Sequence, residues 1–236
     1  MCVDYRMNKY ILITIISIIV SVVLIQILFY HKKHNVYQIN QIMGINNISK
    51  NMNHKFPTIL RLFSANPQKI LNNIYDDLGI DRKNEAQIIV KNKSLKKLDF
   101  YKKFAKYAHM CRPLHLIQYS HAVLNSELNE QIYRSPLSDS FFIMNIGIVP
   151  ITIKLFSPEN VKKFKQHTKD KNSVIYLEKN TKTNFIDLII KPLDIVYIPN
   201  YWIYQINTDS CDYCCISEYS LFTYFHSIFT KFLYKK

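Results

Sequence analysis

The chain has 236 residues, 48% of them hydrophobic, and its 31 Lys and Arg residues against 17 Asp and Glu give a formal net charge of +14. This hydrophobic content excludes a disordered chain, three glycines exclude a collagen-like repeat, and five cysteines are too few for a disulfide-scaffolded miniprotein of this length. Only five of the basic residues are Arg, which recognises phosphate and guanine better than Lys, so the charge indicates a lysine-rich composition more than a nucleic-acid binder.

The first predicted element is a transmembrane helix over residues 10–30. This run has 21 residues without a formal charge, and Gln26 is its one strongly polar member. At about 1.5 Å per residue it matches the roughly 30 Å hydrocarbon core of a bilayer. A cleaved signal peptide would have a shorter apolar region and a small-x-small site after it. We therefore predict a single-pass membrane protein that is bound to the lipid bilayer through 10–30. Basic residues flank both ends of the run almost equally, so the positive-inside rule does not decide its orientation.

Three further segments surround one soluble domain. Residues 1–9 form the N-terminal flank, and residues 31–55, which are polar and rich in Asn, Lys and His, are interpreted as a polar tether. Residues 56–220 are long enough for one domain with its own core. Residues 221–236 follow as a C-terminal apolar helix.

Within residues 56–220, helix signals come first and strand signals follow. The predicted helices cover residues 68–78, 95–110 and 158–167, with start and stop signals at Asn66, Pro67, Gly79, Ser94, Ser157 and Glu159. Short apolar runs predict strands at 141–145, 151–156, 174–177, 185–190, 194–198, 203–206 and 213–219. These strands lie too close together for βαβ crossovers, so we expect an antiparallel sandwich or open barrel with helices packed outside it.

Four segments of this domain, in order, resemble the cupin-like, JmjC-type hydroxylases, which are double-stranded β-helix dioxygenases using Fe(II) and 2-oxoglutarate. They are Lys55–Arg61, Ser140–Gly147 with Lys154–Glu159, Ile190–Trp202 and Cys215–Tyr219. The most specific part is Asp194, Ile198-Pro199 and Trp202, which is similar to the family's G-D…I-P-x-g-W turn. The resemblance implies an α+β fold class: one transmembrane helix followed by a double-stranded β-helix (cupin-like) domain with flanking helices.

The resemblance also implies where iron would bind. The family's H-x-D/E motif corresponds to Arg134 and Pro136, and its distal His corresponds to Tyr204. A non-heme Fe(II) site needs two His and one carboxylate, whereas Asp139 and Tyr204 would supply one carboxylate and one phenol. We therefore interpret Arg134, Pro136 and Tyr204 as degenerate iron-triad positions.

The same comparison leaves no catalytic residue, no metal ligand and no cofactor to assign. The residues that we expect to line a pocket or form a turn are Asp139, Asp194, Pro199 and Trp202. In two of the family's glycine positions this chain has Leu193 and Tyr201.

The histidines and cysteines give weaker signals. His109, His115 and His121 are six residues apart, which is not the spacing by which one helix chelates a metal. Cys211 and Cys214 form a C-x-x-C that could be half of a zinc site or a redox pair, but packed thiols are the favoured interpretation. A Cys211–Cys214 disulfide would require an oxidising compartment.

Two segments are candidates for contact with partners. Lys91–Lys106 holds seven Lys and one Asp, which indicates either a solvated helix face or a site for anionic lipid. The tail is too short to span a bilayer. It could pack on the sheet, lie at a membrane surface, or form a homodimer through 221–233, which the resemblance favours.

These observations predict a membrane-anchored cupin-like protein with a non-catalytic binding or structural role. One alternative is a 2-oxoglutarate-dependent dioxygenase that binds Fe(II) through non-standard ligands. A second alternative is a basic domain that binds anionic lipid, with nucleic acid as the least favoured partner. The composition and this architecture together resemble proteins of large DNA viruses of amoebae.

Overall fold

The structure is a computed structural model in which the chain forms two compact units, Met1–Lys32 and Lys33–Lys236. The residues that it describes are 2–31, 39–43, 52, 55–61, 66–79, 87–99, 101–102, 104–105, 119–125, 133–136, 138, 140–169, 174–179, 184–207 and 212–219.

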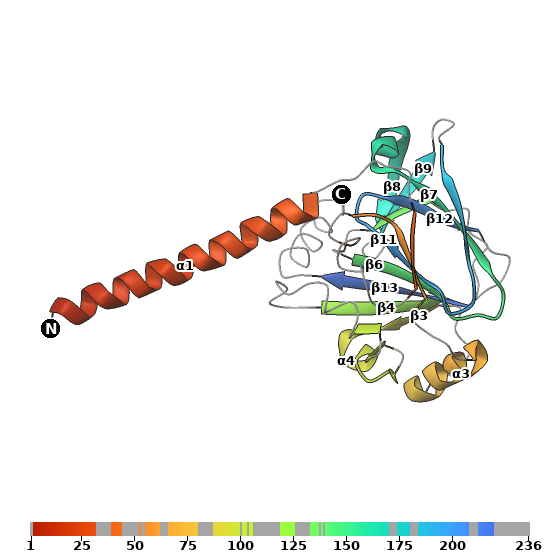
Figure 1. The fold of residues 1–236 in the computed structure, drawn as a ribbon, viewed down its shortest axis with the longest axis horizontal. Coiled ribbons are helices and arrows are strands. Elements are labelled where there is room, and N and C mark those ends of the chain that lie inside the picture. Colours follow the sequence, from red (N-terminus) through yellow and green to blue (C-terminus); the bar gives the residue numbers. More distant parts are fainter. Residues whose placement is uncertain are drawn as a thin grey trace. The chain divides into compact units, whose positions relative to one another are not determined.

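The first unit contains one helix, α1 (Cys2–His31), which is 30 residues long and includes the whole uncharged run (Figure 1). Its described side chains lie between Lys9 and Leu28. Most of the large apolar ones are exposed, from 48% at Ile25 to 71% at Leu28, whereas Val22, Val23 and Ile27 are half-buried. Among the side chains that the structure describes, no helix combines the length and hydropathy of a membrane span.

The second unit is built from two β-sheets, which follow from the alternation of apolar side chains along short segments. In the described part of the chain the larger sheet has the order β1 (Asn40–Met43), β2 (Thr58–Arg61), β11 (Ile195–Ile198), β6 (Ser140–Asn145), β13 (Tyr213–Tyr219), β4 (Tyr119–Asn125), β3 (Gln87–Val90). The smaller sheet has the order β10 (Ile186–Ile190), β7 (Ile151–Phe156), β12 (Ile203–Asn207), β5 (Tyr133–Pro136), β9 (Val174–Lys179), β8 (Phe164–Lys169).

The connectivity identifies the architecture. Along the chain, strands of the two sheets alternate: the larger sheet contributes β4, β6, β11 and β13, and the smaller sheet contributes β5, β7, β10 and β12. The alternation is interrupted between β7 and β10, which belong to the same sheet and pair with each other. All pairings among these eight strands are antiparallel. The fold is therefore α+β with antiparallel sheets and few helices, and its connectivity is compatible with a cupin-like β-sandwich.

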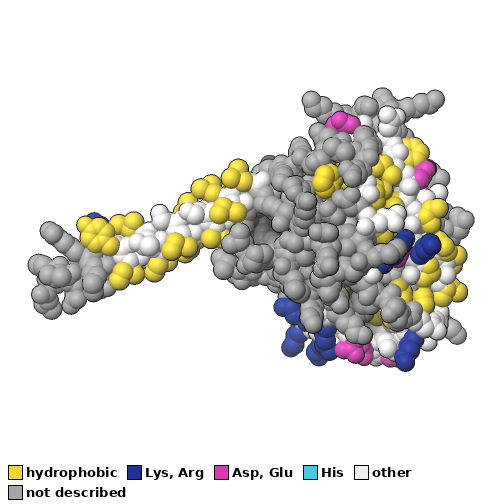
Figure 2. All heavy atoms as spheres, viewed as in Figure 1, with side chains coloured by type: hydrophobic (Ala, Val, Ile, Leu, Met, Phe, Trp, Pro, Cys, Tyr) yellow, Lys and Arg dark blue, Asp and Glu magenta, His cyan; other side chains and the backbone are white. Residues whose placement is uncertain are grey.

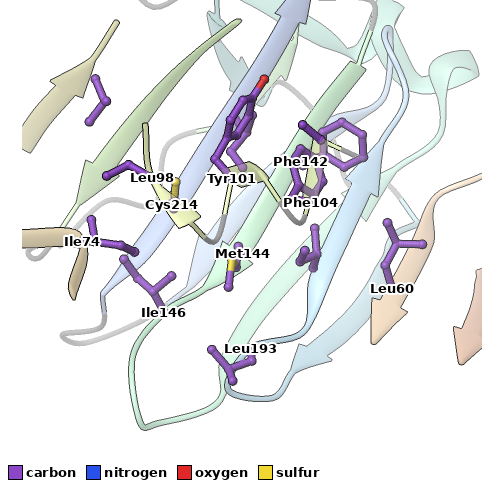
Figure 3. Close-up of a cluster of buried hydrophobic side chains, with 14 of the residues drawn as sticks. Leu60, Ile74, Leu98, Tyr101, Phe104, Phe142, Met144, Ile146, Leu193 and Cys214 are labelled. Atoms are coloured by element: carbon purple, nitrogen blue, oxygen red, sulfur yellow. The ribbon is translucent and has the colours of Figure 1, made fainter. Parts of the chain in front are cut away.

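Two hydrophobic clusters pack against opposite faces of the larger sheet. The inner cluster lies between the sheets and includes Phe141 and Ile143 of β6. The outer cluster includes Phe142 and Met144 of the same strand, because successive side chains of a strand point to opposite faces. Side chains of Ile74 and of the 98–105 segment cover this outer face (Figure 3). We use the names inner cluster and outer cluster below.

Helix α3 (Pro67–Leu78) confirms the predicted helix and its boundaries. The Asn66 side chain accepts a hydrogen bond from the backbone N–H of Gln68, and Pro67 occupies the first turn. Gly79 ends the helix in the left-handed conformation, with φ of 64°. Ile74 and Tyr75 bury the apolar side of the helix in the outer cluster.

Three expectations need correction. The predicted helix through His167 is a short 3₁₀ helix, Pro158–Lys163, followed by strand β8, because pairing with β9 overrides the local helix signal. Ser94 lies inside the short helix α4 (Asn92–Leu95), and beyond α4 the described residues of the predicted helix 95–110 are helical only from Asp99 to Ala105, so Ser94 does not cap that helix. The polar segment 31–55 contributes strand β1, which pairs in parallel with β2.

Candidate functional site

The strand register brings together two of the three residues that the sequence resemblance aligns with iron ligands. Tyr204 of β12 is paired with Arg134 of β5 on one side and with Leu155 of β7 on the other. Pro136 lies two residues further along β5. Asp139 lies outside the described residues, as do the side chains of Arg134 and Pro136.

Tyr204 is part of the hydrophobic interior. Its side chain is 1% exposed and its ring stacks on Phe141, with ring centroids 5.1 Å apart and an interplanar angle of 28°. Leu155, Ile198 and Trp202, all fully or almost fully buried, belong to the same inner cluster. The aromatic pair therefore occupies the barrel interior beside β5.

This set of residues does not fit an Fe(II) site. A phenol, a guanidinium and a proline ring stand at positions 204, 134 and 136, where two imidazoles and a carboxylate would be needed. Within the described ranges, no three His, Cys, Asp or Glu side chains are grouped so that they could hold a metal ion.

The Pro199 turn lies beside this interior and is held by a contact that sequence analysis missed. The Lys55 Nζ donates a hydrogen bond of 2.9 Å to the Asn200 Oδ1, and both side chains are buried. The Trp202 N–H donates to the Pro199 carbonyl at 3.3 Å. A lysine that precedes an apolar strand gives no indication of a partner 145 residues away.

Tyr201 sits in this turn with φ of 68°, the left-handed region that favours glycine. It occupies a glycine position of the resembled family. The same is true of Leu193, whose φ is 66°. Both turns therefore hold a large side chain in a backbone conformation that favours glycine. Partial burial raises the pKa of the Tyr201 phenol.

Asp194 belongs to a second group of polar residues. Its Oδ1 lies 3.5 Å from the Arg61 Nε, and its Oδ2 accepts a hydrogen bond from the Lys191 N–H at 3.3 Å. Its backbone carbonyl accepts from the Asn145 N–H at 3.1 Å. Asp194 therefore joins the ends of β2, β6 and β11, which is a structural role in the turn.

Asn145 is the centre of this second group. Its Nδ2 donates to the carbonyls of Val149 at 2.7 Å and Ile190 at 3.1 Å, and its Oδ1 accepts from the Gly147 N–H at 3.0 Å. Its own carbonyl accepts from the Leu193 N–H at 2.8 Å. One fully buried amide thus connects the β6–β7 turn to the turn before β11. Its position in the family-like segment was recognised in the sequence, but its bonding was not.

The two groups lie at opposite ends of β11. Asp194 precedes Ile195 and Pro199 follows Ile198, so at about 3.3 Å per residue they are separated by roughly 16 Å. The pocket or turn candidates Asp194, Pro199 and Trp202 therefore do not converge on one site. We call the residues around Asp194, Asn145 and Arg61 the Asp194 end, and those around Tyr204, Trp202 and Asn200 the Tyr204 end.

The two cysteines of β13, Cys214 and Cys215, are buried and form no disulfide. Cys214 belongs to the outer cluster and Cys215 to the inner cluster, as expected for neighbours on a strand. Burial, and secondarily the adjacent Cys215, raises the pKa of the Cys214 thiol well above its usual value. Cys214 therefore stays protonated at neutral pH and is a poor nucleophile. Cys211, His109 and His115 lie outside the described residues.

No family model and no curated protein sequence matches the chain. Among solved structures the chain is similar to Streptomyces albus HEPD with 2-hydroxyethylphosphonate and Fe(II) bound, with a TM-score of 0.28 and 14% sequence identity. The similarity covers 46% of this chain and 20% of that one, so the chain matches about a fifth of its length. A similarity of this extent implies neither a shared reaction nor a shared ligand.

Proposed function

We propose that this chain is a membrane-anchored, cupin-like protein with a non-catalytic binding or structural role at a membrane. The observation that carries the proposal is the packing of Tyr204, which stacks on Phe141 between the two sheets; the sequence resemblance aligns Tyr204 with the distal iron ligand of the hydroxylases.

Packing at the Tyr204 end supports the absence of iron chemistry. A non-heme iron site keeps open coordination positions for oxygen and cosubstrate. Here Phe141, Leu155, Trp202 and Tyr204 contribute to one apolar cluster, and each is at most 2% exposed. Filling this volume stabilises the fold by removing large apolar surfaces from water. The same side chains would have to move apart to admit a cosubstrate.

The anchor part of the proposal rests on α1. The uncharged run 10–30 lies within a single helix, Cys2–His31, so the run extends about 30 Å along its axis. Most of the described large apolar side chains of this helix are exposed, and about half or more of the surface of Ile18, Val20 and Leu24 is accessible. A helix that exposes so much apolar surface in water would be stabilised by transfer to a bilayer.

Iron binding and turnover test the non-catalytic part. The full chain in detergent micelles is incubated anaerobically with Fe(II), then assayed for bound iron and for succinate formed from 2-oxoglutarate in air. We expect no stoichiometric iron and no succinate above the level of a Tyr204→Phe control. Stoichiometric iron with succinate formation that Tyr204→Phe abolishes would establish the dioxygenase alternative instead.

Flotation tests the anchor independently. The full chain, mixed with neutral phosphatidylcholine vesicles during detergent removal, is expected to float with them and to resist extraction at alkaline pH. Recovery of the chain in the unbound fraction would contradict the anchor and leave the iron result unaffected.

A further inference from the structure

The segment 91–105 buries one side and exposes lysines on the other. Leu98, Tyr101 and Phe104 are each 1% exposed, and the Phe104 ring contacts Phe142 of β6 edge-to-face at 4.8 Å. The lysines that are exposed are Lys91, Lys93, Lys96, Lys97 and Lys102. Buried aromatic side chains thus fix this segment on the outer face of the larger sheet.

Backbone hydrogen bonds fix the lysine-bearing turns as well. The Ser94 N–H donates to the Lys91 carbonyl and the Lys97 N–H donates to the Ser94 carbonyl, each at 3.0 Å. In Figure 2, dark blue side chains lie at the lower edge of the domain near the place of α4 in Figure 1, with magenta side chains beside them along the same edge. The charges are therefore presented on an ordered surface.

Little negative charge balances these lysines. Asp99 is the one acidic residue in the segment 91–105, and its Oδ1 pairs with the Lys102 Nζ at 2.8 Å. Within the described part of the chain, Lys91, Lys93, Lys96 and Lys97 have no ion pair. We call these four residues the lysine face.

The chemistry of the lysine face favours a diffuse anionic surface. Lys carries a compact charge on a flexible stem, whereas bidentate recognition of phosphate and of guanine uses the planar fork of Arg, and Arg is absent from 91–105. Each Lys close to an anionic leaflet adds to the attraction, and the effect is additive over several residues. Anchoring by α1 would hold the domain within reach of such a surface, so that weak contacts suffice.

We propose that the lysine face docks the domain on anionic phospholipid head groups of the membrane that holds α1. This inference rests on the anchor of the proposed function, and it adds a defined surface of the domain as the second membrane contact.

Lysine footprinting on the full chain tests the docking. The chain is reconstituted into neutral phosphatidylcholine vesicles or into vesicles with about 30% phosphatidylserine, and labelled with a membrane-impermeant amine reagent before peptide mass spectrometry. We expect labelling of the lysine face to be about threefold lower on the anionic vesicles, and the protection to disappear in about 1 M salt. Lys69 and Lys191, which are exposed elsewhere on the domain, should label equally on both.

Two matched variants locate the effect. Lys93→Gln with Lys96→Gln and Lys97→Gln should abolish the protection of Lys91. Lys69→Gln with Lys154→Gln and Lys191→Gln removes the same charge from other surfaces and should leave it intact.

Equal labelling of the lysine face on the two kinds of vesicle would overturn the proposal, as would equal protection of Lys69 and Lys191. Protection of the lysine face by added RNA or duplex DNA on neutral vesicles, without protection by anionic lipid, would identify nucleic acid as the partner and reject lipid. If the chain fails to float with neutral vesicles, the anchor is wrong. In that case, the same lysine labelling of the free chain, with neutral or anionic vesicles added, tests docking by the lysine face independently of the anchor.

Discussion

The two ends of β11 differ in what holds them together. At the Asp194 end, buried polar groups dominate: Asn145 alone makes hydrogen bonds to both neighbouring turns, and Asp194 pairs with Arg61. At the Tyr204 end the ring of Tyr204 stacks on Phe141 within the inner cluster, and the buried Lys55–Asn200 hydrogen bond holds the adjacent Pro199 turn.

This difference teaches that the two ends of β11 are stabilised by different kinds of interaction. The carbonyls of Asp194 and Pro199 each accept a backbone hydrogen bond, from the Asn145 N–H and the backbone N–H of Trp202, so both residues have a structural role in their turns. At position 204 the volume between the sheets is filled by an aromatic ring, and such packing stabilises the fold.

The largest effect should come from emptying the Tyr204 end. Tyr204→Ala removes a buried ring and leaves a cavity, so we expect the free energy of unfolding to fall by about 4 kcal/mol. Tyr204→Phe keeps the ring on Phe141 and should cost about 1 kcal/mol or less. Urea unfolding of the full chain in detergent micelles, followed by circular dichroism, measures both. A cost for Tyr204→Ala no larger than that for Tyr204→Phe would show that the ring is not packed.

Removing the central amide of the Asp194 end should have the next largest effect. Asn145→Ala deprives the Val149 and Ile190 carbonyls and the Gly147 N–H of a buried partner, which should cost about 3 kcal/mol. The control is Asn73→Ala, at an exposed position of α3, with a change within about 0.5 kcal/mol. If the two variants unfold at the same urea concentration, Asn145 does not join the turns.

The left-handed backbone conformation of Tyr201 in the Pro199 turn should appear as a smaller difference between two variants. Tyr201→Gly and Tyr201→Ala both remove the ring, but only Gly adopts a φ of 68° without strain. We expect the Gly variant to be about 1 kcal/mol more stable than the Ala variant, by the same unfolding measurement. Gly79→Ala, where φ is 64° and no heavy atom lies within 4 Å of an added Cβ, should cost a similar amount. Equal stability of Tyr201→Gly and Tyr201→Ala would argue against strain at this turn.

The ion pair at the Asp194 end should contribute least. The Arg61 side chain is 32% exposed, so solvent screens its interaction with Asp194. Arg61→Gln is expected to lower stability by about 0.5 kcal/mol at low salt. The difference should vanish in about 1 M salt, and a loss that persists there would indicate packing by the arginine stem.

Most of the later strands could be predicted from the sequence because their signals are local. Apolar runs bounded by Gly147 and Pro150 gave β6 and β7 to within one residue. Strand β5 could not be recognised, because its four residues include Arg134 and Pro136 and its pairing depends on β9 and β12. Strand β8 was mistaken for a helix because Ser157-Pro158-Glu159 is a genuine helix start, which here produces only a 3₁₀ turn.

The hydrogen bonds of the candidate site could not be predicted from the sequence either, because their partners lie far apart in the chain. The Asn145 amide bonds a carbonyl 45 residues away, and Lys55 reaches Asn200 across 145 residues. Such contacts are set by the register of the sheets and leave no periodic pattern in the chain. The resemblance to a family identified the positions 134 and 204, and the register then showed that they are paired.

The fluorescence of Trp202 tests the central claim most directly. It is the single Trp of the chain and is fully buried in the inner cluster that also contains Tyr204, so a metal ion entering the interior would quench it. The measurement is an anaerobic titration of the full chain with Fe(II), with and without 2-oxoglutarate. The apolar interior predicts no saturable quenching in either case. Saturable quenching at one equivalent of Fe(II), strengthened by 2-oxoglutarate and lost in Tyr204→Phe, would contradict a non-catalytic barrel.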